Sequence, residues 1–519
     1  MGQQCEKGDK CLGLHDMAEY LKTKVEDLNS GHIPECPQLR EHGYCKFGYK
    51  CRFLRSHMDE QQALTRCTPT PAQQEVHTLH YTVLGSLRKR TLKFPITQAV
   101  TARLSENPNP APVLTTRQVR STSEDAIEPA TPVSSSTHVY PSTLVASAAL
   151  LNPEAQDKKQ IDWKGKLVLA PLTTIGNLPF RRICKGLGAD ITICEMAMAS
   201  KILEGSASEL ALLKRHPSED VFGVQLAGRT PRQLAEAIEL IESHSTTKVD
   251  FFDVNAGCPI DLVFQQGMGS ALCGNLPRMK SILRTISAVS TVPVTIKIRM
   301  GVYTGTPNAH SYVDKLGEWG ASAFTLHGRS RQARYSMLAD WEYIDRCSRL
   351  AKIPLIGNGD VYNWEDAVAH LDNTQASALM VARGAIIKPW VFKEIKERRY
   401  WDISATERLN YVRDFCEYGL SHWGSDQRGV DTTRRFALEW LSFLYRYIPV
   451  GLLEALPSRI NHRPPCHYGY FGRSELETKL ASADPLDWIE ITEMFLGPAP
   501  SGFSFTPKHR AEAFTRVER

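Results

Sequence analysis

Long hydrophobic runs are missing from this sequence. No segment approaches the roughly 20 apolar residues that cross a bilayer, and residues 1–10 are polar and charged. A strong excess of one charge is also missing, since the net charge is only +5 over 519 residues. We therefore expect an intracellular protein, cytoplasmic or nuclear or both, monomeric and without membrane contact. A mildly basic chain permits a nucleic-acid partner but does not require one.

Cysteine is too sparse for a disulfide scaffold. The chain has 13 cysteines, five of them within the first 51 residues and the others scattered. In a reducing compartment such residues serve as metal ligands, catalytic thiols or small core residues. The sequence shows no internal repeat of the solenoid type. A chain of 519 residues therefore predicts two to four ordinary domains.

Composition divides the chain into four zones. Residues 1–60 are rich in Cys, His, Lys and Arg, and residues 61–160 hold ten prolines among many Ser and Thr. The second zone has too little apolar surface to offset its ordering entropy, which predicts a disordered linker. Residues 161–400 alternate short apolar runs with amphipathic stretches, and residues 401–519 have the spacing of a small helical domain.

Eight short apolar runs in the third zone predict strands, with helical stretches between them. Eight strands alternating with helices over about 230 residues are typical of a (β/α)8 TIM barrel, an α/β fold. An open doubly wound sheet is the alternative, but its Gly-x-Gly-x-x-Gly fingerprint after the first strand is absent. The predicted strands are residues 167–172, 191–196, 221–225, 251–255, 294–300, 323–327, 354–357 and 378–381.

Polar residues end nearly every predicted strand, where a barrel of this kind has its active site. Any one of them alone is more often a turn, cap or structural residue. Eight such groups buried unpaired at one rim would cost roughly 1–3 kcal/mol each, so together they predict a site. The strand-end residues are Thr173, Glu195, Gln225, Asp253, Asn255, Cys258, Lys297, Arg299, His327, Arg329, Asn358, Asp360 and Arg383.

Glycine-rich turns follow the last two predicted strands, at residues 357–360 and 383–384. Loops in these positions of a barrel commonly bind phosphate through backbone N–H groups, and Arg383 adds a charge-assisted contact. Lys297 and Gln225 suit the edge of a flavin ring, because a cation and an amide stabilise its reduced, anionic form. The rim therefore indicates a phosphate-bearing cofactor and suits a flavin.

Residues 253–259, Asp-Val-Asn-Ala-Gly-Cys-Pro, resemble the Asp-x-Asn-x-Gly-Cys-Pro signature of the tRNA-dihydrouridine synthase family. Together with the Cys/His-rich N-terminus, the resemblance points to the eukaryotic branch that acts on uridine 47. It covers residues 161–519 and implies a (β/α)8 barrel followed by a helical tRNA-binding domain. Further segments similar to the family, in matching order, are residues 170–173, 269–272, 297–299, 327–331, 357–360, 382–384 and 459–465.

The resemblance implies an enzyme that reduces the uracil 5,6 double bond in tRNA with FMN, recycled by NADPH or NADH; it leaves mRNA open as a further substrate. Hydride would pass from FMN to C6 and a proton from Cys258 to C5, since a thiol with a pKa near 8.5 stays protonated at neutral pH. Most free cysteines are buried core residues, but the setting between Gly257 and Pro259 favours catalysis. The residues implied to hold FMN are Pro171, Leu172, Thr173, Gln225, Asn255, Lys297, His327, Asn358, Gly359, Asp360, Ala382, Arg383 and Gly384.

Three cysteines and one histidine near the N-terminus have the spacing of zinc ligands and resemble a CCCH zinc finger. Phe47, Tyr49 and Phe53 alternate with Lys and Arg, which favours stacking on single-stranded RNA. The predicted Zn2+ ligands are Cys36, Cys45, Cys51 and His57; Cys5, Cys11 and His15 match three ligands of a second finger, to which we assign no function.

A uridine in folded tRNA must be extruded to reach such a pocket, and the surrounding contacts should be cationic. For any single arginine, a solvated basic face is an equally good interpretation. The predicted RNA contacts are Arg299, Arg329, Arg331 and Arg334 at the rim and Arg459, Asn461 and Arg463 in the helical domain.

Two other functions stay open at this point. One is an FMN barrel reductase acting on a small molecule, of the dihydroorotate dehydrogenase type, against which the finger and the basic helical domain argue. The other is a catalytically silent RNA-binding protein, against which the intact set of Cys258, Lys297, His327 and Arg383 argues.

Overall fold

The computed structural model describes residues 16–28, 31–59, 64–67, 79–106, 158–452 and 470–508. Within these ranges, no helix is both long enough and apolar enough to cross a membrane. The centre of the molecule is a closed barrel of eight parallel strands. These strands are β1 (Leu167–Leu169), β2 (Ile191–Ile193), β4 (Val221–Ala227), β5 (Phe251–Ala256), β6 (Val294–Arg299), β7 (Ala323–His327), β8 (Leu355–Asn358) and β9 (Ala378–Val381). Their order around the barrel is β2-β1-β9-β8-β7-β6-β5-β4, and pairing of β2 with β4 closes it.

All eight predicted strands and the barrel class are confirmed. A short ninth strand, β3 (Ala197–Met198), extends the pairing at the end of β4. Apolar side chains such as Val168, Ile193 and Ile356 fill the barrel interior, and Trp163 packs edge-on against Phe251 at 5.4 Å among them. Because the interior is solid, chemistry is confined to the rim.

Helices surround the barrel and bury their apolar faces against the outer side of the strands. Side-chain caps fix their starts: Thr230 accepts the N–H of Gln233, and Asn275 accepts the N–H of Arg278. The helices following the strands are α5 (Leu178–Gly186), α6 (Ala199–Leu203), α7 (Ala207–Leu212), α8 (Pro231–His244), α9 (Asp261–Gln265), α10 (Leu276–Val289), α11 (Trp341–Leu350), α12 (Trp364–Asp372), α13 (Arg383–Ile387) and α14 (Val391–Glu397).

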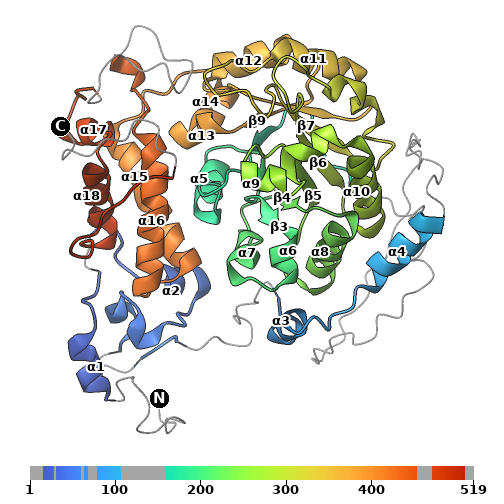
Figure 1. Ribbon diagram of the computed structural model, residues 1–519. Coiled ribbons are helices and arrows are strands. Elements are labelled where there is room, and N and C mark those ends of the chain that lie inside the picture. The colour runs from blue at the N-terminus through green and yellow to red at the C-terminus, as the bar shows by residue number, and fades with distance from the viewer. Residues whose placement is uncertain are drawn as a thin grey trace, which may run out of the picture.

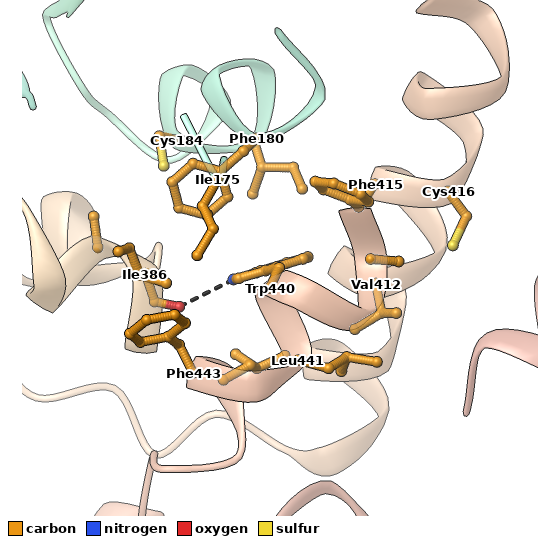
Figure 2. Packing of buried hydrophobic residues seen from close by; sticks show 14 of the residues in the cluster. Ile175, Phe180, Cys184, Ile386, Val412, Phe415, Cys416, Trp440, Leu441 and Phe443 are labelled. Atoms are coloured by element: carbon orange, nitrogen blue, oxygen red, sulfur yellow. Dashed lines mark hydrogen bonds between the residues drawn. The ribbon is translucent and has the colours of Figure 1, made fainter. Parts of the chain in front are cut away.

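The C-terminal helices share one core with the barrel. Figure 2 shows Trp440 packed between Phe180 and Phe415, with ring-centroid distances of 5.6 and 5.3 Å, while its indole N–H donates to the carbonyl of Ile386 at 3.0 Å. Ser404 and Glu407 form a capping box at the first helix. These helices are α15 (Ala405–Trp423), α16 (Gln427–Leu444), α17 (Glu475–Leu480) and α18 (Pro485–Leu496).

The N-terminal segment, drawn blue in Figure 1, packs against the C-terminal helices. It contains α1 (Met17–Thr23) and α2 (Pro37–His42), followed by short 3-10 turns. The side-chain amide of Gln38 donates to the carbonyl of Leu420 at 3.0 Å, and the N–H of Arg52 donates to the carbonyl of Ser425 at 2.7 Å. Hydrogen bonds to backbone carbonyls therefore join the N-terminal segment to the C-terminal helices.

The prediction of a disordered linker over residues 61–160 is wrong for residues 79–106. These form α3 (Tyr81–Arg88) and α4 (Pro95–Glu106), which lie along the outside of the barrel (Figure 1). Glu239 of α8 accepts the N–H groups of Ile96 and Thr97 at 3.1 and 2.7 Å. The few apolar residues of this segment suffice because helices already formed by the barrel provide the rest of the core.

Candidate active site

A buried hydrogen-bond chain joins the ends of β4 and β5. The Gln225 amide donates to Asp253 at 2.7 Å, and the Asn255 amide donates to Gln225 Oε1 at 2.7 Å. Thr295 donates to the other oxygen of Asp253 at 2.7 Å, and burial raises the pKa of that carboxyl. The chain fixes which way the Asn255 side chain points, because each amide group has a defined partner.

Asn255 in turn holds the loop that carries Cys258. Its Oδ1 accepts the N–H of Gly257 at 3.2 Å and the N–H of Cys258 at 2.9 Å. The carbonyl of Cys258 accepts the N–H and O–H of Ser270 at 3.1 and 2.8 Å. Burial raises the pKa of the half-buried Cys258 thiol, so it remains protonated at neutral pH, as a general acid must.

Two cations lie at the end of β6, inside the mouth. Lys297 Nζ donates to Asn358 Oδ1 at 3.0 Å, and Asn358 donates to the carbonyl of Met380 at 2.8 Å. Arg299 donates to the carbonyl of Gly257 at 2.7 Å, next to Cys258. Burial, and then the neighbouring Arg299, lowers the pKa of Lys297 to about 8. Lys297 thus lies where it can hydrogen-bond the edge of a flavin.

Asp360, which follows β8, organises the part of the mouth next to these cations. It accepts Arg329 Nη2 at 2.8 and 2.6 Å through its two oxygens, Arg383 Nη2 at 2.7 Å and the N–H of Ala339 at 2.7 Å. His327 lies 3.3 Å from Arg329, and burial together with the surrounding cations holds its pKa well below the usual value. His327 is therefore neutral and offers one donor and one acceptor.

The two glycine turns predicted to bind phosphate are tightly packed. A side chain at Gly384 would place Cβ 2.2 Å from the carbonyl of Val361, and one at Gly359, where φ is +134°, would place it 2.5 Å from Ala339. Only glycine fits at either position. The close backbone and the adjacent Arg383 suit a phosphate group, which supports FMN at this end of the barrel.

The loop after β1, which holds residues 171–173, is anchored by β2 and by the C-terminal segment. Thr174 has a φ of +78°, unusual for a branched residue, and its N–H donates to Glu195. Burial raises the pKa of Glu195 to about 7. Lys508 Nζ, carried from the far end of the chain, lies 3.4 Å from Thr174 Oγ1.

Two residues at the mouth were missed by the sequence prediction. Lys508 is 334 positions from its contact Thr174, and no local pattern marks it. Tyr335 lies in the loop after β7 with its ring 4.1 Å from the guanidinium of Arg383. A lone aromatic between polar loop residues carries no periodic signal, so only the tertiary structure shows it.

Two of the predicted RNA contacts need correction. Arg299 and Arg329 are both buried, with exposed fractions of 4% and 2%, and are bonded to Gly257 and Asp360 respectively. They organise the mouth and do not face an RNA backbone. Arg331 is only partly buried and forms an ion pair with Asp261. Arg334 is exposed, while Arg459, Asn461 and Arg463 lie outside the described residues.

The four predicted zinc ligands converge. The thiols of Cys36, Cys45 and Cys51 and the His57 ring nitrogen lie within 4.8 Å of one another, and all four residues are buried. The hydroxyl of Ser425, from the turn between α15 and α16, lies 3.2–3.6 Å from the three sulfurs. Three soft sulfurs and one imidazole fit tetrahedral Zn2+, and a hydroxyl donor beside the sulfurs suits thiolates.

Stacking on RNA, predicted for the aromatic residues of the finger, is wrong for Phe53, and Arg52, one of the cations between them, is not exposed either. Phe53 and Arg52 are buried, with 3% and 7% of their surfaces exposed. The half-buried Phe47 packs against the core of the helical region. These side chains attach the finger to α15 and α16, because a small zinc module needs a neighbour to complete its core.

A parallel (β/α)8 barrel with buried cations and tightly packed glycine turns at the rim that carries one thiol is typical of the class of flavin-dependent barrel oxidoreductases. The family model described as "Dihydrouridine synthase (Dus)" matches residues 168–432, and the model described as "DUS3L CCCH zinc finger domain" matches residues 24–60. The chain belongs to the dihydrouridine synthase family. The prediction of FMN with NADPH or NADH as its reductant, and of Zn2+, is thereby confirmed.

Curated relatives cover nearly the whole chain. A mouse and a human protein, each named tRNA-dihydrouridine(47) synthase [NAD(P)(+)]-like, are 46% identical over 98% of this chain, and the match covers 80% and 79% of their lengths. A protein of the fungus Coprinopsis cinerea named tRNA-dihydrouridine(47) synthase [NAD(P)(+)] is 42% identical over 100% of the chain and 86% of its own length.

Lys297 provides a test of the flavin site that also reads out stability. We expect Lys297→Met to lower tRNA reduction at least about tenfold, yet to raise the free energy of unfolding of the FMN-free protein at pH 7 by about 1–3 kcal/mol, because a desolvated ammonium bonded to the neutral amide of Asn358 is costly. Wild-type stability should rise as pH increases from about 8 toward 10.5, where the unfolded chain binds the lysine proton more tightly. Urea unfolding across this pH range measures the free energy of unfolding of both proteins. If the stability of Lys297→Met rose with pH as much as that of wild type, Lys297 would not be the group with the lowered pKa.

Proposed function

We propose that this protein reduces uridine 47 of tRNA to dihydrouridine, with Cys258 as the proton donor. The Cys258 thiol at the mouth of the barrel, on a loop held by Asn255 and Arg299, is the observation that carries the proposal, because a thiol with a raised pKa can supply the proton that the reduction needs beyond the cofactor. The names of the relatives support tRNA and position 47.

The chain's own residues divide the work at the mouth. Asn255 orients the backbone at Cys258, and Arg299 holds the same loop through the carbonyl of Gly257. Bound FMN supplies the hydride, which protein side chains cannot. Cys258 Sγ holds the proton that goes to C5 of uracil, and Lys297 offers an ammonium to the flavin ring. The residues proposed to hold FMN are Pro171, Leu172, Thr173, Gln225, Asn255, Lys297, His327, Asn358, Gly359, Asp360, Ala382, Arg383 and Gly384.

RNA binding in this proposal involves three parts of the chain. Arg331 and Arg334 lie at the rim, exposed lysines lie on the finger, and residues 401–519 form the helical domain proposed to bind tRNA, with Arg459, Asn461 and Arg463 as contacts. The enzyme is proposed to act as a monomer inside the cell, in the cytoplasm, the nucleus or both. An unpaired uridine in mRNA meets the same chemical requirements and is proposed as a further substrate.

Mass spectrometry of tRNA from cells lacking this protein tests the function. Dihydrouridine should disappear from position 47 and remain elsewhere, and the purified protein with FMN and NADPH should restore it on that tRNA. A transcript with cytidine at position 47 is the control and should stay unreduced there. If dihydrouridine persists at position 47 in cells that lack the protein, or disappears from another position instead, the proposed substrate is wrong.

A further inference from the structure

Exposed apolar side chains are concentrated at the mouth of the barrel. Among the described residues, 11 large hydrophobic side chains are exposed, and six of them lie in the segments that follow β5, β6 and β7, with Leu262 on the short helix α9. Tyr335 is one of the six and lies over Arg383. The other five, which we call the rim patch, are Ile260, Leu262, Tyr303, Met337 and Leu338.

The loops that carry the rim patch are tied to one another. The guanidinium of Arg331, in the segment after β7, forms an ion pair with Asp261, in the segment after β5. The backbone N–H of Arg331 donates to the carbonyl of Gly301, in the loop after β6, at 3.0 Å. The Gln332 side chain accepts the N–H of Thr304 at 3.2 Å. The three loops therefore form one connected surface.

The β7 loop is also anchored to the interior of the mouth. The carbonyl of Met337 accepts Arg329 Nε at 2.9 Å, and the N–H of Ala339 donates to Asp360 at 2.7 Å. Apolar side chains held outward on an anchored backbone are unfavourable in water, so their concentration at one site indicates a partner.

The charges beside the rim patch indicate which partner it is. Arg331 lies on the same loop with its guanidinium 3.8 Å from the ring of Phe264, and Arg334 is exposed nearby. Aromatic and apolar side chains beside arginines suit unstacked nucleobases joined by phosphates. The patch also continues into the active site, since Ile260 is two residues from Cys258.

We propose that the rim patch binds the nucleobases on either side of the target uridine. This inference rests on the proposed function. Extruding one base from folded RNA breaks its stacking on both neighbours. Tyr303 and Leu262, with exposed fractions of 61% and 67%, provide a replacement surface for the neighbouring bases beside the entrance that the uridine uses.

The test compares Tyr303→Ala and Leu262→Ala with matched control variants far from the mouth. The controls are Tyr81→Ala on α3 and Leu350→Ala on α11, whose side chains are also exposed, at 73% and 44%. We expect each patch variant to raise the KM for tRNA about tenfold, as loss of one stacked base does. The kcat, and the rate at which NADPH reduces bound FMN, should match those of the controls.

A second substrate identifies the bases as the contact. This substrate is a tRNA with abasic sites on both sides of the target uridine. On it, the KM of wild type should rise to the level that the patch variants show on intact tRNA, and the KM of the patch variants should rise little further. If the KM of Tyr303→Ala exceeded the KM of wild type by the same factor on the intact and the abasic tRNA, that result would overturn the proposal. So would a wild-type protein that is dimeric in solution and becomes monomeric on Tyr303→Ala.

Failure of the proposed function gives a different result. If wild type forms no dihydrouridine on any tRNA, the function is wrong, while fluorescence anisotropy with the same RNAs still compares patch and control variants. If wild type is active and patch variants match the controls in KM and affinity, the function stands and the rim patch is not an RNA surface.

Discussion

Cys258→Ala should retain FMN and its reduction by NADPH but reduce tRNA about 100- to 10,000-fold more slowly than wild type, the range by which a positioned general acid accelerates a reaction. Asn255 and Ser270 bond the backbone of Cys258 and not its sulfur, so these contacts should survive removal of the thiol. Single-turnover reduction of tRNA by the pre-reduced enzyme measures the chemical step directly.

Cys273→Ala is the matched control. Its thiol also has a raised pKa, but it is fully buried and donates to the carbonyl of Ala256 at the end of β5. We expect that variant to keep near-wild-type turnover and to lose only stability. An active Cys258→Ala enzyme would refute the proton-donor assignment.

The same assignment fixes the direction of the pH dependence. A thiol is a competent acid below its pKa, and burial raises the pKa of Cys258. Deprotonation of Lys297 near pH 8 should slow wild type and Cys258→Ala alike, whereas the fall in single-turnover rate caused by the thiol should come only above the pKa of an ordinary thiol. The slow residual reaction of Cys258→Ala should lack this alkaline fall.

Cys45→Ser should lose zinc, unfold the finger and weaken tRNA binding about tenfold or more, while NADPH still reduces FMN. Structural zinc supplies a large share of a finger's folding free energy. Unfolding would also remove the contacts of Gln38 and Arg52 with the helical region and release the exposed Lys46 and Lys50 from their fixed positions. Metal content, protease sensitivity and tRNA affinity together report the change.

Cys67→Ser serves as the control, because Cys67 is close in sequence, half-buried and outside the ligand cluster. It should keep zinc and tRNA affinity. Unchanged tRNA binding by zinc-free Cys45→Ser would exclude the finger from RNA recognition and leave it a role in stability only.

Local pattern was enough for the elements that repeat a simple period. Each strand is a short apolar run ended by a polar residue, and the Cys/His spacing is a property of one short segment. The sequence also placed Asn255, Cys258, Lys297 and Asn358 at one rim, because parallel strands carry their final residues to the same end.

Tertiary structure decided which of those rim residues are exposed. Arg329 looks like a surface cation in the sequence, but Asp360, 31 positions later, takes it into the interior. The same holds for Phe53, buried by the finger's attachment to α15 and α16, and for residues 79–106, folded by contact with α8.

The sequence alone thus determined the barrel, the zinc ligands and the position of the candidate thiol, since these follow from spacing along the chain. Only the folded protein determined that Lys508 reaches Thr174, and that five apolar side chains stay exposed in the segments that follow β5, β6 and β7. The reason is physical: burial and contact depend on groups brought together across hundreds of residues, which no local period records.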